Sequence, residues 1–171
     1  MTPTLSTGRL SLRQLKKPTA RQVSWLNDPE VMRFSEQRHR EHSMDSQGRY
    51  IDLFKDGSHI WGIYRVDTRD HIGNISAMHD KPNKVSDVGI MIGESGLWGQ
   101  GYASEAWHTI CNWLLAKEGG EVRKLEAGCM RDNMAMLKII RSSGFTEEGE
   151  RKNHFLLGGS PVGMVLFGRV P

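Results

Sequence analysis

The stretch VGIMIGESGLWGQGYASEA, residues Val88–Ala106, is the part of this sequence that decides its fold. Its apolar first residues are typical of a buried β-strand, its glycines of a tight turn, and its last residues of a helix that begins near Gly101. A strand that passes through glycines into a helix directs unpaired backbone N–H groups and the positive end of the helix dipole toward one point. Such a point favours a phosphate or pyrophosphate ligand.

The composition indicates one globular domain that spans residues 1–171. Charged residues make up 25% of the chain and hydrophobic residues 37%, which is typical of a folded core rather than a disordered segment. No apolar run approaches the roughly 20 residues that span a membrane, and the N-terminus lacks an apolar signal segment. Cys111 and Cys129 have no metal-ligand spacing, so we expect two buried thiols, no metal and a cytoplasmic location.

The net charge of +3 does not by itself indicate a nucleic-acid partner. The 23 Lys and Arg residues are scattered among 20 Asp and Glu residues, and no long basic block is present. The aromatic residues form no stripe on which bases would stack. We therefore expect a small polyanionic ligand, with no nucleic acid and no membrane as partners.

Hydrophobic periodicity and turn residues predict an α/β domain whose mixed, mostly antiparallel sheet has about seven strands, flanked by about four helices. The expected helices are Thr19–Asn27, Asp45–Lys55, Gly101–Glu118 (ended by Gly119 and Gly120) and Asn133–Ser143. The expected strands are Gly8–Leu15, His59–Val66, Asp70–His79, Val85–Ile92, Lys124–Met130, Phe145–Leu157 and Pro161–Val170. No repeat or interdomain linker interrupts this order.

The glycine turn does not match the two commonest phosphate-binding motifs. A P-loop requires G-x-x-x-x-G-K-[ST], which the sequence lacks, and a dinucleotide-binding turn requires a third glycine that does not follow Gly101. Taken alone, the turn is as compatible with an ordinary strand-to-helix connection as with a ligand site.

Two motifs together resemble those of the GNAT superfamily of acyl-coenzyme A N-acetyltransferases. The family's phosphate signature, Q/R-x-x-G-x-G/A, is matched by Gly99 and Gly101, although Gly96 stands at its first position. A second family block, N-x-x-(S/A)-x-x-x-x-x-x-x-G-F, is similar to MRDNMAMLKIIRSSGF, with three residues in register: Asn133, Gly144 and Phe145. The segment WGQGYASEA is similar to the branch that contains ribosomal-protein N-terminal and polyamine acetyltransferases.

The resemblance implies a single-domain enzyme that transfers an acetyl group from acetyl-CoA to a primary amine by direct attack in a ternary complex. It implies that strands Val85–Ile92 and Lys124–Met130 splay apart, so that the pantetheine arm pairs with the exposed backbone of the first. The residues expected to bind acetyl-CoA are Ile90, Met91, Ile92, Trp98, Gly99, Gln100, Gly101, Tyr102, Ala103, Ser104, Asn133 and Lys138. Asn133 is also suited to cap a helix, Lys138 to a solvated helix face, and Ile90 and Ile92 to the core.

The catalytic groups are less well defined than the acyl-donor site. Many family members carry a tyrosine four residues before the glycine of the G-F pair, where this sequence has Ile140, which cannot donate a proton. Another group, water or backbone dipoles must then stabilise the leaving thiolate. Tyr102 is a poor substitute because it belongs to the phosphate turn. The candidate catalytic carboxylates are Asp87, at a position where some relatives carry an acid, and Glu36; without a visible partner for Asp87, the residues themselves favour an edge or turn carboxylate there.

The acceptor amine is expected to bind at Glu36–His42, where acids, arginines and histidines cluster after WLNDPEV. Glu36, Arg38 and His39 would form a polar pocket, and the arginines favour an anionic acceptor. The W-x-N-x-P-E-V pattern resembles acetyltransferases that act on nucleotide-linked amino sugars. A solvated charged loop is the other interpretation of this segment.

The sequence leaves several alternatives open for the acceptor and for the assembly. The acceptor is a small molecule, such as an amino sugar or a polyamine, or a protein N-terminus, and the chain is compatible with a homodimer. Because Ile140 replaces the usual tyrosine, the alternative function is a non-catalytic acyl-CoA-binding module.

Overall fold

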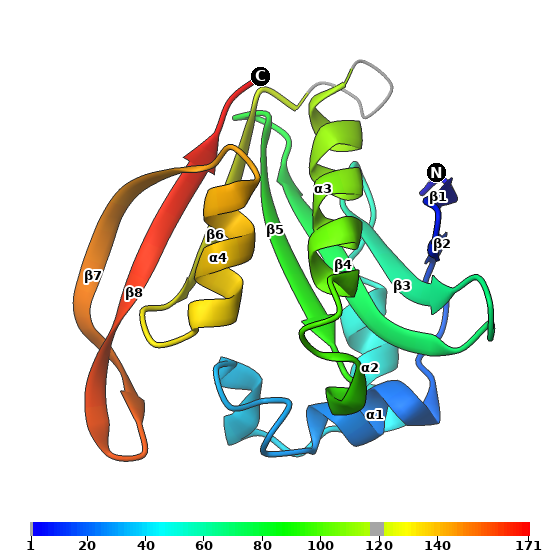
Figure 1. Ribbon diagram of the computed structural model, residues 1–171, viewed down its shortest axis with the longest axis horizontal. Helices are drawn as coiled ribbons and strands as arrows, with labels where there is room; N and C mark the ends of the chain where they lie inside the picture. Colours follow the sequence, from blue (N-terminus) through cyan, green and yellow to red (C-terminus); the bar gives the residue numbers. More distant parts are fainter. Residues whose placement is uncertain (1, 117–121) are drawn as a thin grey trace.

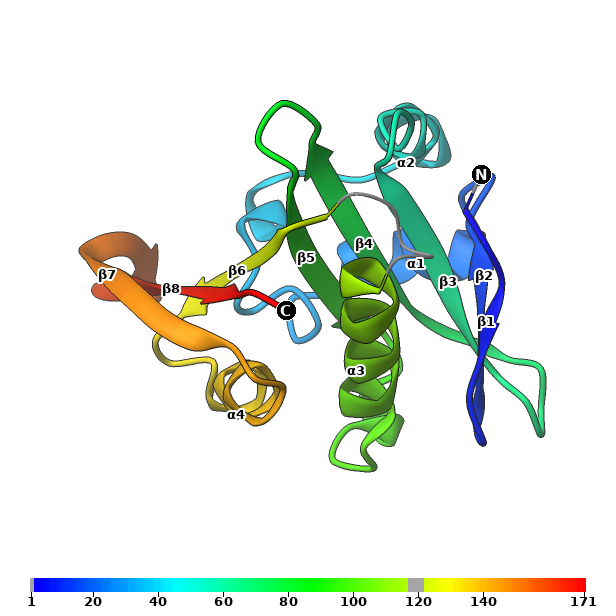
Figure 2. The same cartoon turned by 90° about the horizontal axis from the view of Figure 1, so that it is seen from above.

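The computed structural model describes residues 2–116 and 122–171, which form one eight-stranded sheet with helices on both faces (Figure 1; Figure 2). The strand order is β1-β2-β3-β4-β5-β6-β8-β7, and every neighbouring pair is antiparallel except β5 and β6. The strands are β1 Leu5–Ser6, β2 Leu10–Gln14, β3 His59–Arg65, β4 His71–Asp80, β5 Val85–Ile92, β6 Lys124–Met130, β7 Thr146–Leu157 and β8 Ser160–Arg169. The predicted mixed, mostly antiparallel α/β fold is confirmed.

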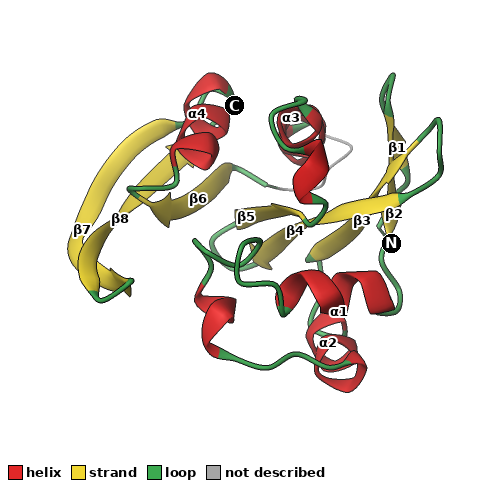
Figure 3. Ribbon diagram, turned by 60° about the horizontal axis from the view of Figure 1, so that its bottom comes forward, coloured by secondary structure: helices red, strands yellow, loops and turns green. Residues whose placement is uncertain are grey.

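The helices cover opposite faces of this sheet (Figure 3). Helices α3 (Tyr102–Leu115) and α4 (Met134–Ser142) lie on one face, and α1 (Ala20–Leu26) and α2 (Met44–Ile51) lie on the other. Two 3-10 turns, η1 (Glu36–His39) and η2 (Ser95–Leu97), complete the described elements. No helix in the described ranges is long and apolar enough to cross a membrane.

The main core lies between α3 and the sheet. Trp107, Ile110 and Leu114 of α3 are fully buried against apolar side chains of the central strands. Successive side chains of β5 point to opposite faces of the sheet. Val88 and its even-numbered neighbours face α3 and join this core, whereas Asp87, Gly89 and Met91 face α1 and α2. Each fully buried large apolar side chain contributes about 1.5–3 kcal/mol. One strand thus carries core residues on one face and polar cleft residues on the other.

The sheet has one strand more than the predicted seven. The strand expected at Gly8–Leu15 begins at Leu10, and the turn before it is closed by the Thr7 N–H, which donates to the Leu10 carbonyl (2.9 Å). The chain before that turn adds β1, in which Leu5 pairs with Leu12. Sequence patterns missed this strand because it is only two residues long.

Two predicted helices end earlier than expected. Helix α2 ends at Ile51 rather than Lys55, because the chain tightens into turns in which the Leu53 N–H donates to the Tyr50 carbonyl (3.1 Å) and the Phe54 N–H to the Ile51 carbonyl (3.0 Å). Helix α3 ends at Leu115, and Ala116 is already extended (ψ 159°). The predicted continuation to Glu118 and the stop at Gly119-Gly120 lie outside the described residues.

Candidate active site

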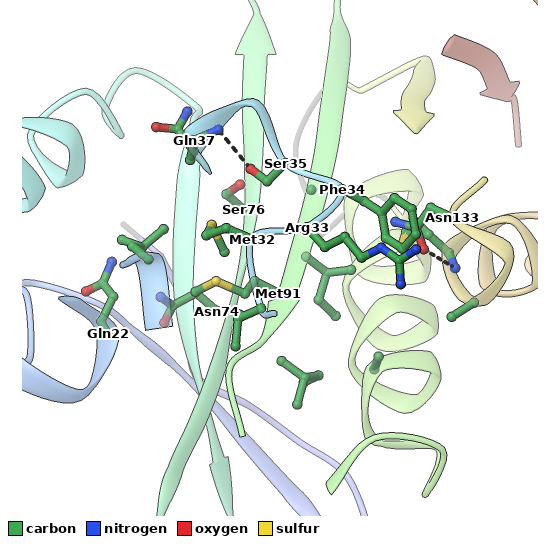
Figure 4. Close-up of a pocket in the computed structure, with 18 of the residues that line it drawn as sticks. Gln22, Met32, Arg33, Phe34, Ser35, Gln37, Asn74, Ser76, Met91 and Asn133 are labelled. Atoms are coloured by element: carbon green, nitrogen blue, oxygen red, sulfur yellow. Dashed lines mark hydrogen bonds between the residues drawn. The ribbon is translucent and has the colours of Figure 1, made fainter. Parts of the chain in front are cut away.

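A cleft of about 1460 Å³ runs from the N-terminus of α3, past β5, to the face of the sheet that α1 and α2 cover. Its walls come from β4, β5, α1, α2, the start of α3, the inner side of α4 and the α1–α2 loop (residues 27–43, which include η1). Figure 4 shows part of this lining, with Ser76 and Met91 on the strands and Asn133 at the start of α4.

The cleft opens because β5 and β6 separate. They pair over only three residues, Val85–Asp87 on β5 against Lys124–Glu126 on β6. Beyond that point β6 continues along β8 and β5 along β4, and the two strands diverge in Figure 1. The splay implied by the family resemblance is therefore present.

The register of β5 determines which backbone groups face this opening. The Gly93 N–H donates to the Ile72 carbonyl (2.9 Å), and hydrogen-bonded pairs alternate along an antiparallel ladder. Met91 therefore turns its peptide groups toward β4, whereas Ile90 and Ile92 turn theirs toward the opening. We call the peptide groups of Ile90 and Ile92 the open edge of β5. The side chains of both residues pack partly against the core, which leaves their peptide groups at the opening for a ligand.

Trp98 restricts part of this edge. Its indole Nε1 donates to the Ile92 carbonyl (2.8 Å), while its side chain stays 42% exposed beside the cleft. The Ile92 carbonyl keeps one lone pair for a further donor, and the peptide groups of Ile90 remain free of strand partners on this side.

The glycine turn presents backbone N–H groups to the same cleft. Gly99 and Gly101 adopt φ angles of +76° and +85°, which glycine reaches without strain. The first N–H that bonds within α3 belongs to Glu105, which donates to the Gly101 carbonyl (3.0 Å), so those of Tyr102–Ser104 point out of the helix end. No side chain caps α3, whereas α1, α2 and α4 each have a side-chain cap.

Arg9 contacts both the glycine turn and the first turn of α3. Its guanidinium pairs with Glu105 (2.7 Å), donates to the Gln100 carbonyl (2.9 Å) and lies 4.4 Å from the centre of the Tyr102 ring. Burial raises the pKa of Glu105, but hydrogen bonds from Thr7 and Arg9 outweigh it and leave this pKa below its ordinary value. Gln100 is not in the cleft lining, and its side chain donates to the Gly96 carbonyl (3.0 Å).

Helix α4 forms the wall opposite the open edge. Asn133 caps this helix, since its side-chain oxygen accepts from the Met136 N–H (3.2 Å), and it also lines the cleft. Lys138, one turn further along, is exposed and lines the cleft as well. Ile140 is fully buried in the core, and its neighbour Ile139 lines the cleft in its place. The position where relatives carry a tyrosine therefore faces away from the site.

Polar groups that are distant in the sequence meet on the α1–α2 side of the splay. Asp87 stands opposite Met78, Ser76 stands opposite Gly89, and Tyr50 projects from α2. Asp87 is solvent-exposed by surface area, yet surrounding protein still desolvates it; this, with the charge of Glu126, raises its pKa to about 6. Sequence reasoning missed Tyr50 and Ser76, because only the packing of α2 beneath β4 brings them to Asp87.

Only part of the charged cluster predicted to bind the acceptor reaches the cleft. Glu36 lines it, but Arg38 and His39 do not. The Arg38 guanidinium donates to Glu36 (2.7 Å) and to the Leu156 carbonyl of β7 (2.8 Å), so it ties the α1–α2 loop to the β7–β8 hairpin. His39 is largely exposed, with its Nε2 3.6 Å from Glu36. Other residues of the loop, Arg33 and Phe34, extend toward Asn133 in Figure 4.

A buried hydrogen-bond chain fixes the base of this loop. Gln22 Nε2 donates to Gln47 Oε1 (3.4 Å), and Gln47 Nε2 donates to His42 Nδ1 (3.1 Å). His42 Nε2 then donates to the Gln37 carbonyl (3.0 Å), which can only accept, so this tautomer is the one required. Asn27 closes the loop by donating to the His42 carbonyl and accepting from its N–H, both at 2.8 Å.

The two cysteines lie away from this chemistry. Cys111 is buried and Cys129 is half-buried, and burial raises the pKa values of their thiols to about 12 and about 11. Within residues 2–116 and 122–171, no group of three or more His, Cys, Asp or Glu side chains could hold a metal ion.

Known proteins resemble this chain in sequence and in fold. A profile of the "Acetyltransferase (GNAT) domain" family matches residues 9–146. The uncharacterized N-acetyltransferase YoaA of Bacillus subtilis (strain 168) is 27% identical over 168 residues, 94% of this chain and 93% of that protein. RimL, a ribosomal L7/L12 alpha-N-protein acetyltransferase solved with coenzyme A, has a TM-score of 0.83 at 20% identity and 98% coverage of both chains. The microcin C7 self-immunity acetyltransferase MccE, solved with acetyl-CoA and AMP, has a TM-score of 0.77 at 16% identity and covers 96% of this chain and 94% of its own.

Proposed function

Because this chain belongs to the GNAT acetyltransferase family, we propose that it transfers the acetyl group of acetyl-CoA to a primary amine. The observation that carries this proposal is the open edge of β5, which leads directly into the uncapped N-terminus of α3. A strand edge pairs with amide groups, and an uncapped helix start binds phosphate. Coenzyme A joins an amide-rich pantetheine arm to a pyrophosphate, so its two halves match these two features in order.

The acyl donor would lie along residues of β5, α3 and α4. The N–H groups of Gly99–Ser104 would bind the pyrophosphate, with Trp98 beside them and Gln100 contributing main-chain atoms only. The pantetheine amides would pair with Ile90 and Ile92, whereas Met91 would contribute its side chain rather than its peptide groups. Asn133 and Lys138 would contact the arm or a phosphate from the opposite wall.

This direction fixes where the thioester lies. The pyrophosphate site follows Ile92 in the chain, so an arm that starts there and runs along the open edge passes Ile90 toward Gly89. The sulfur then lies near the point where β5 and β6 meet, on a level with Asp87. The acceptor amine would enter from the α1–α2 side, where the cleft is widened by the absence of a side chain at Gly89.

Acetyl transfer would proceed by direct attack of the neutral amine on the thioester carbonyl. A carbon–nitrogen bond forms, the carbon–sulfur bond breaks, and the amine loses one proton. Asp87 is the base we assign to that proton, because its raised pKa of about 6 leaves it ionised at neutral pH yet basic enough to accept. Glu36 is a weaker candidate base, since Arg38 already neutralises it, and we assign it to acceptor binding.

The charges around the acceptor end favour a cationic amine. Glu30, Glu36, Glu41 and Asp87 line this part of the cleft, against the arginines at 33 and 40. Arg38, one of the arginines that favoured an anionic acceptor, is held by Leu156 outside the lining. This balance supports a polyamine or a protein N-terminus over a nucleotide-linked sugar. The two free thiols fit a cytoplasmic enzyme.

The test is turnover with a defined panel of amines. Acetyl-CoA is mixed with spermidine, glucosamine, or hexapeptides that begin with Ser or Ala, and the released thiol is measured. We expect turnover with at least one cationic amine and none that depends on added metal. Calorimetric binding of acetyl-CoA without turnover on any amine would contradict the proposal and support the non-catalytic acyl-CoA-binding module.

A further inference from the structure

The three tyrosines of this chain occupy very different surroundings. Tyr64, on β3, stacks on His71 with ring centres 4.7 Å apart and is covered by the guanidinium of Arg13. Tyr102 is 8% exposed and packs into the core beneath Arg9. Tyr50 is 39% exposed and lines the cleft from α2, the helix that covers the acceptor side. It is therefore the tyrosine whose ring and hydroxyl are open to a bound substrate.

Tyr50 and Ser76 line the same cleft as Gly89 of β5. Ser76 pairs with Gly89 across the β4–β5 ladder, and its hydroxyl oxygen is 3.7 Å from the position that a Cβ on Gly89 would take. The Tyr50 side chain lies close enough to Ser76 and Asp87 for both to act on its pKa, and its ring packs edge-on against Phe54 with centres 5.2 Å apart. The phenol therefore lies in the same cleft as Gly89 and Asp87, on the side of the sheet that α2 covers.

The leaving sulfur reaches this level under the proposed function. An arm that runs along Ile92 and Ile90 brings the thioester to Gly89, where no side chain separates it from the Ser76 hydroxyl. The position used by many relatives cannot serve, because Ile140 is apolar and fully buried. From these placements we propose that Tyr50 is the catalytic acid that protonates the leaving thiolate of coenzyme A.

The proton balance closes within the named groups. The amine attacks the carbonyl carbon, the tetrahedral adduct collapses with cleavage of the carbon–sulfur bond, and the sulfur takes the proton of the Tyr50 hydroxyl. Asp87 takes the proton that the amine nitrogen loses. Asp87 then releases that proton to water and the Tyr50 phenolate takes one from water, which restores both groups, so no other reagent is consumed.

Electrostatics support the direction of this transfer. Burial raises the pKa of Tyr50; the nearby Ser76 hydroxyl opposes this rise and the charge of Asp87 reinforces it. A phenol with a raised pKa is fully protonated at neutral pH, which suits an acid and excludes a phenolate base in the resting enzyme.

The test replaces Tyr50 and Tyr64, one at a time, by phenylalanine and measures steady-state kinetics with acetyl-CoA and the best amine of the panel. Tyr50→Phe should lower kcat by roughly 100-fold or more, the usual contribution of a positioned acid, with KM for acetyl-CoA within twofold of the wild type. Tyr64→Phe is the matched control outside the cleft and should keep kcat. Thermal melting checks that each variant folds, and Ser76→Ala should lower kcat less than Tyr50→Phe does.

Two results would overturn the assignment. A folded Tyr50→Phe whose kcat stays within threefold of the wild type would show that the phenol transfers no proton. A rise in the amine KM at unchanged kcat would show that Tyr50 only binds the acceptor. If the wild type itself turns over no amine, the proposed function fails and this inference fails with it. The wild-type assay, run beside each variant, separates this outcome from the other two.

Discussion

Replacing Asp87 by asparagine separates the proposed base from the rest of the site. Asp87 has a pKa of about 6, raised by burial and by the charge of Glu126. A single group with this pKa is about 10% ionised at pH 5 and about 90% ionised at pH 7. If ionised Asp87 accepts the proton of the amine, its ionisation alone raises kcat/KM about tenfold between these values. The asparagine side chain has nearly the same shape as that of aspartate and cannot titrate.

The assay is kcat/KM for the amine from pH 4.5 to 8.5, in wild type and Asp87→Asn, at saturating acetyl-CoA. The acceptor amine also titrates, and this contributes a second limb that both proteins share. We expect the limb near pH 6 to be present only in the wild type, and Asp87→Asn to be slower by roughly 100-fold at pH 7. An Asp87→Asn profile that keeps the limb near pH 6, or keeps the wild-type rate, would refute the assignment of Asp87 as the base.

Asp87→Asn should slow the reaction but stabilise the fold. The fold raises the pKa of Asp87 above its ordinary 3.8, so the native state loses stability as pH rises through that value toward 6. Asp87→Asn removes this loss. Its melting temperature should equal that of the wild type near pH 3.5, exceed it increasingly between pH 4 and 6, and keep a constant advantage above pH 6.5. A variant that is less stable than the wild type at pH 7 would contradict the cause given for the shift.

Three further substitutions test two walls of the cleft and the loop beside it. Gly99→Ala should lower the free energy of unfolding by about 1–2 kcal/mol, because a φ of +76° strains any other residue, and should weaken coenzyme A binding measured by calorimetry. Gly96→Ala, at a position that is open and not left-handed, should change neither the stability nor the binding. Asn133→Ala should lose about 1 kcal/mol of stability with the α4 cap, whereas Asn133→Ser should keep the cap and so reveal, as weaker coenzyme A binding, any contact made by the amide. Arg38→Ala should release the α1–α2 loop from Leu156 at a cost of about 1 kcal/mol in thermal unfolding, and change KM for the amine but not for acetyl-CoA. Equal effects on both KM values would show that Arg38 acts on the whole fold.

The acyl-donor half of the site could be predicted from the sequence because its determinants are local. The turn at Gly99–Gly101 depends on φ angles that glycine supplies, and the strand and helix on either side follow from hydrophobic periodicity. The helix cap at Asn133 depends only on the three residues that follow it. Such features depend on only a few neighbouring residues, so a single sequence is enough to predict them.

The acceptor half could not be predicted in the same way, because long-range contacts decide it. Arg38 belongs to a charged cluster in the sequence, yet a carbonyl 118 residues later draws it out of the cleft. Tyr50 looks like an ordinary residue of an amphipathic helix until α2 packs under β4 and brings it to Ser76. Ile140 occupies a position known from the family, but only the orientation of α4 shows that the position faces the core. Burial and pairing across the sheet, rather than residue type, assign these three roles.

The most direct test of the central claim is amide hydrogen exchange at the open edge of β5, measured by NMR with and without saturating coenzyme A. We expect the Ile90 and Ile92 amides, which lack a strand partner, to exchange quickly in the free protein and to become protected when the pantetheine arm pairs with them. The Met91 amide, bonded toward β4, should be protected in both states and serves as the internal control. Saturable coenzyme A binding that leaves the exchange of Ile90 and Ile92 unchanged would contradict the claim.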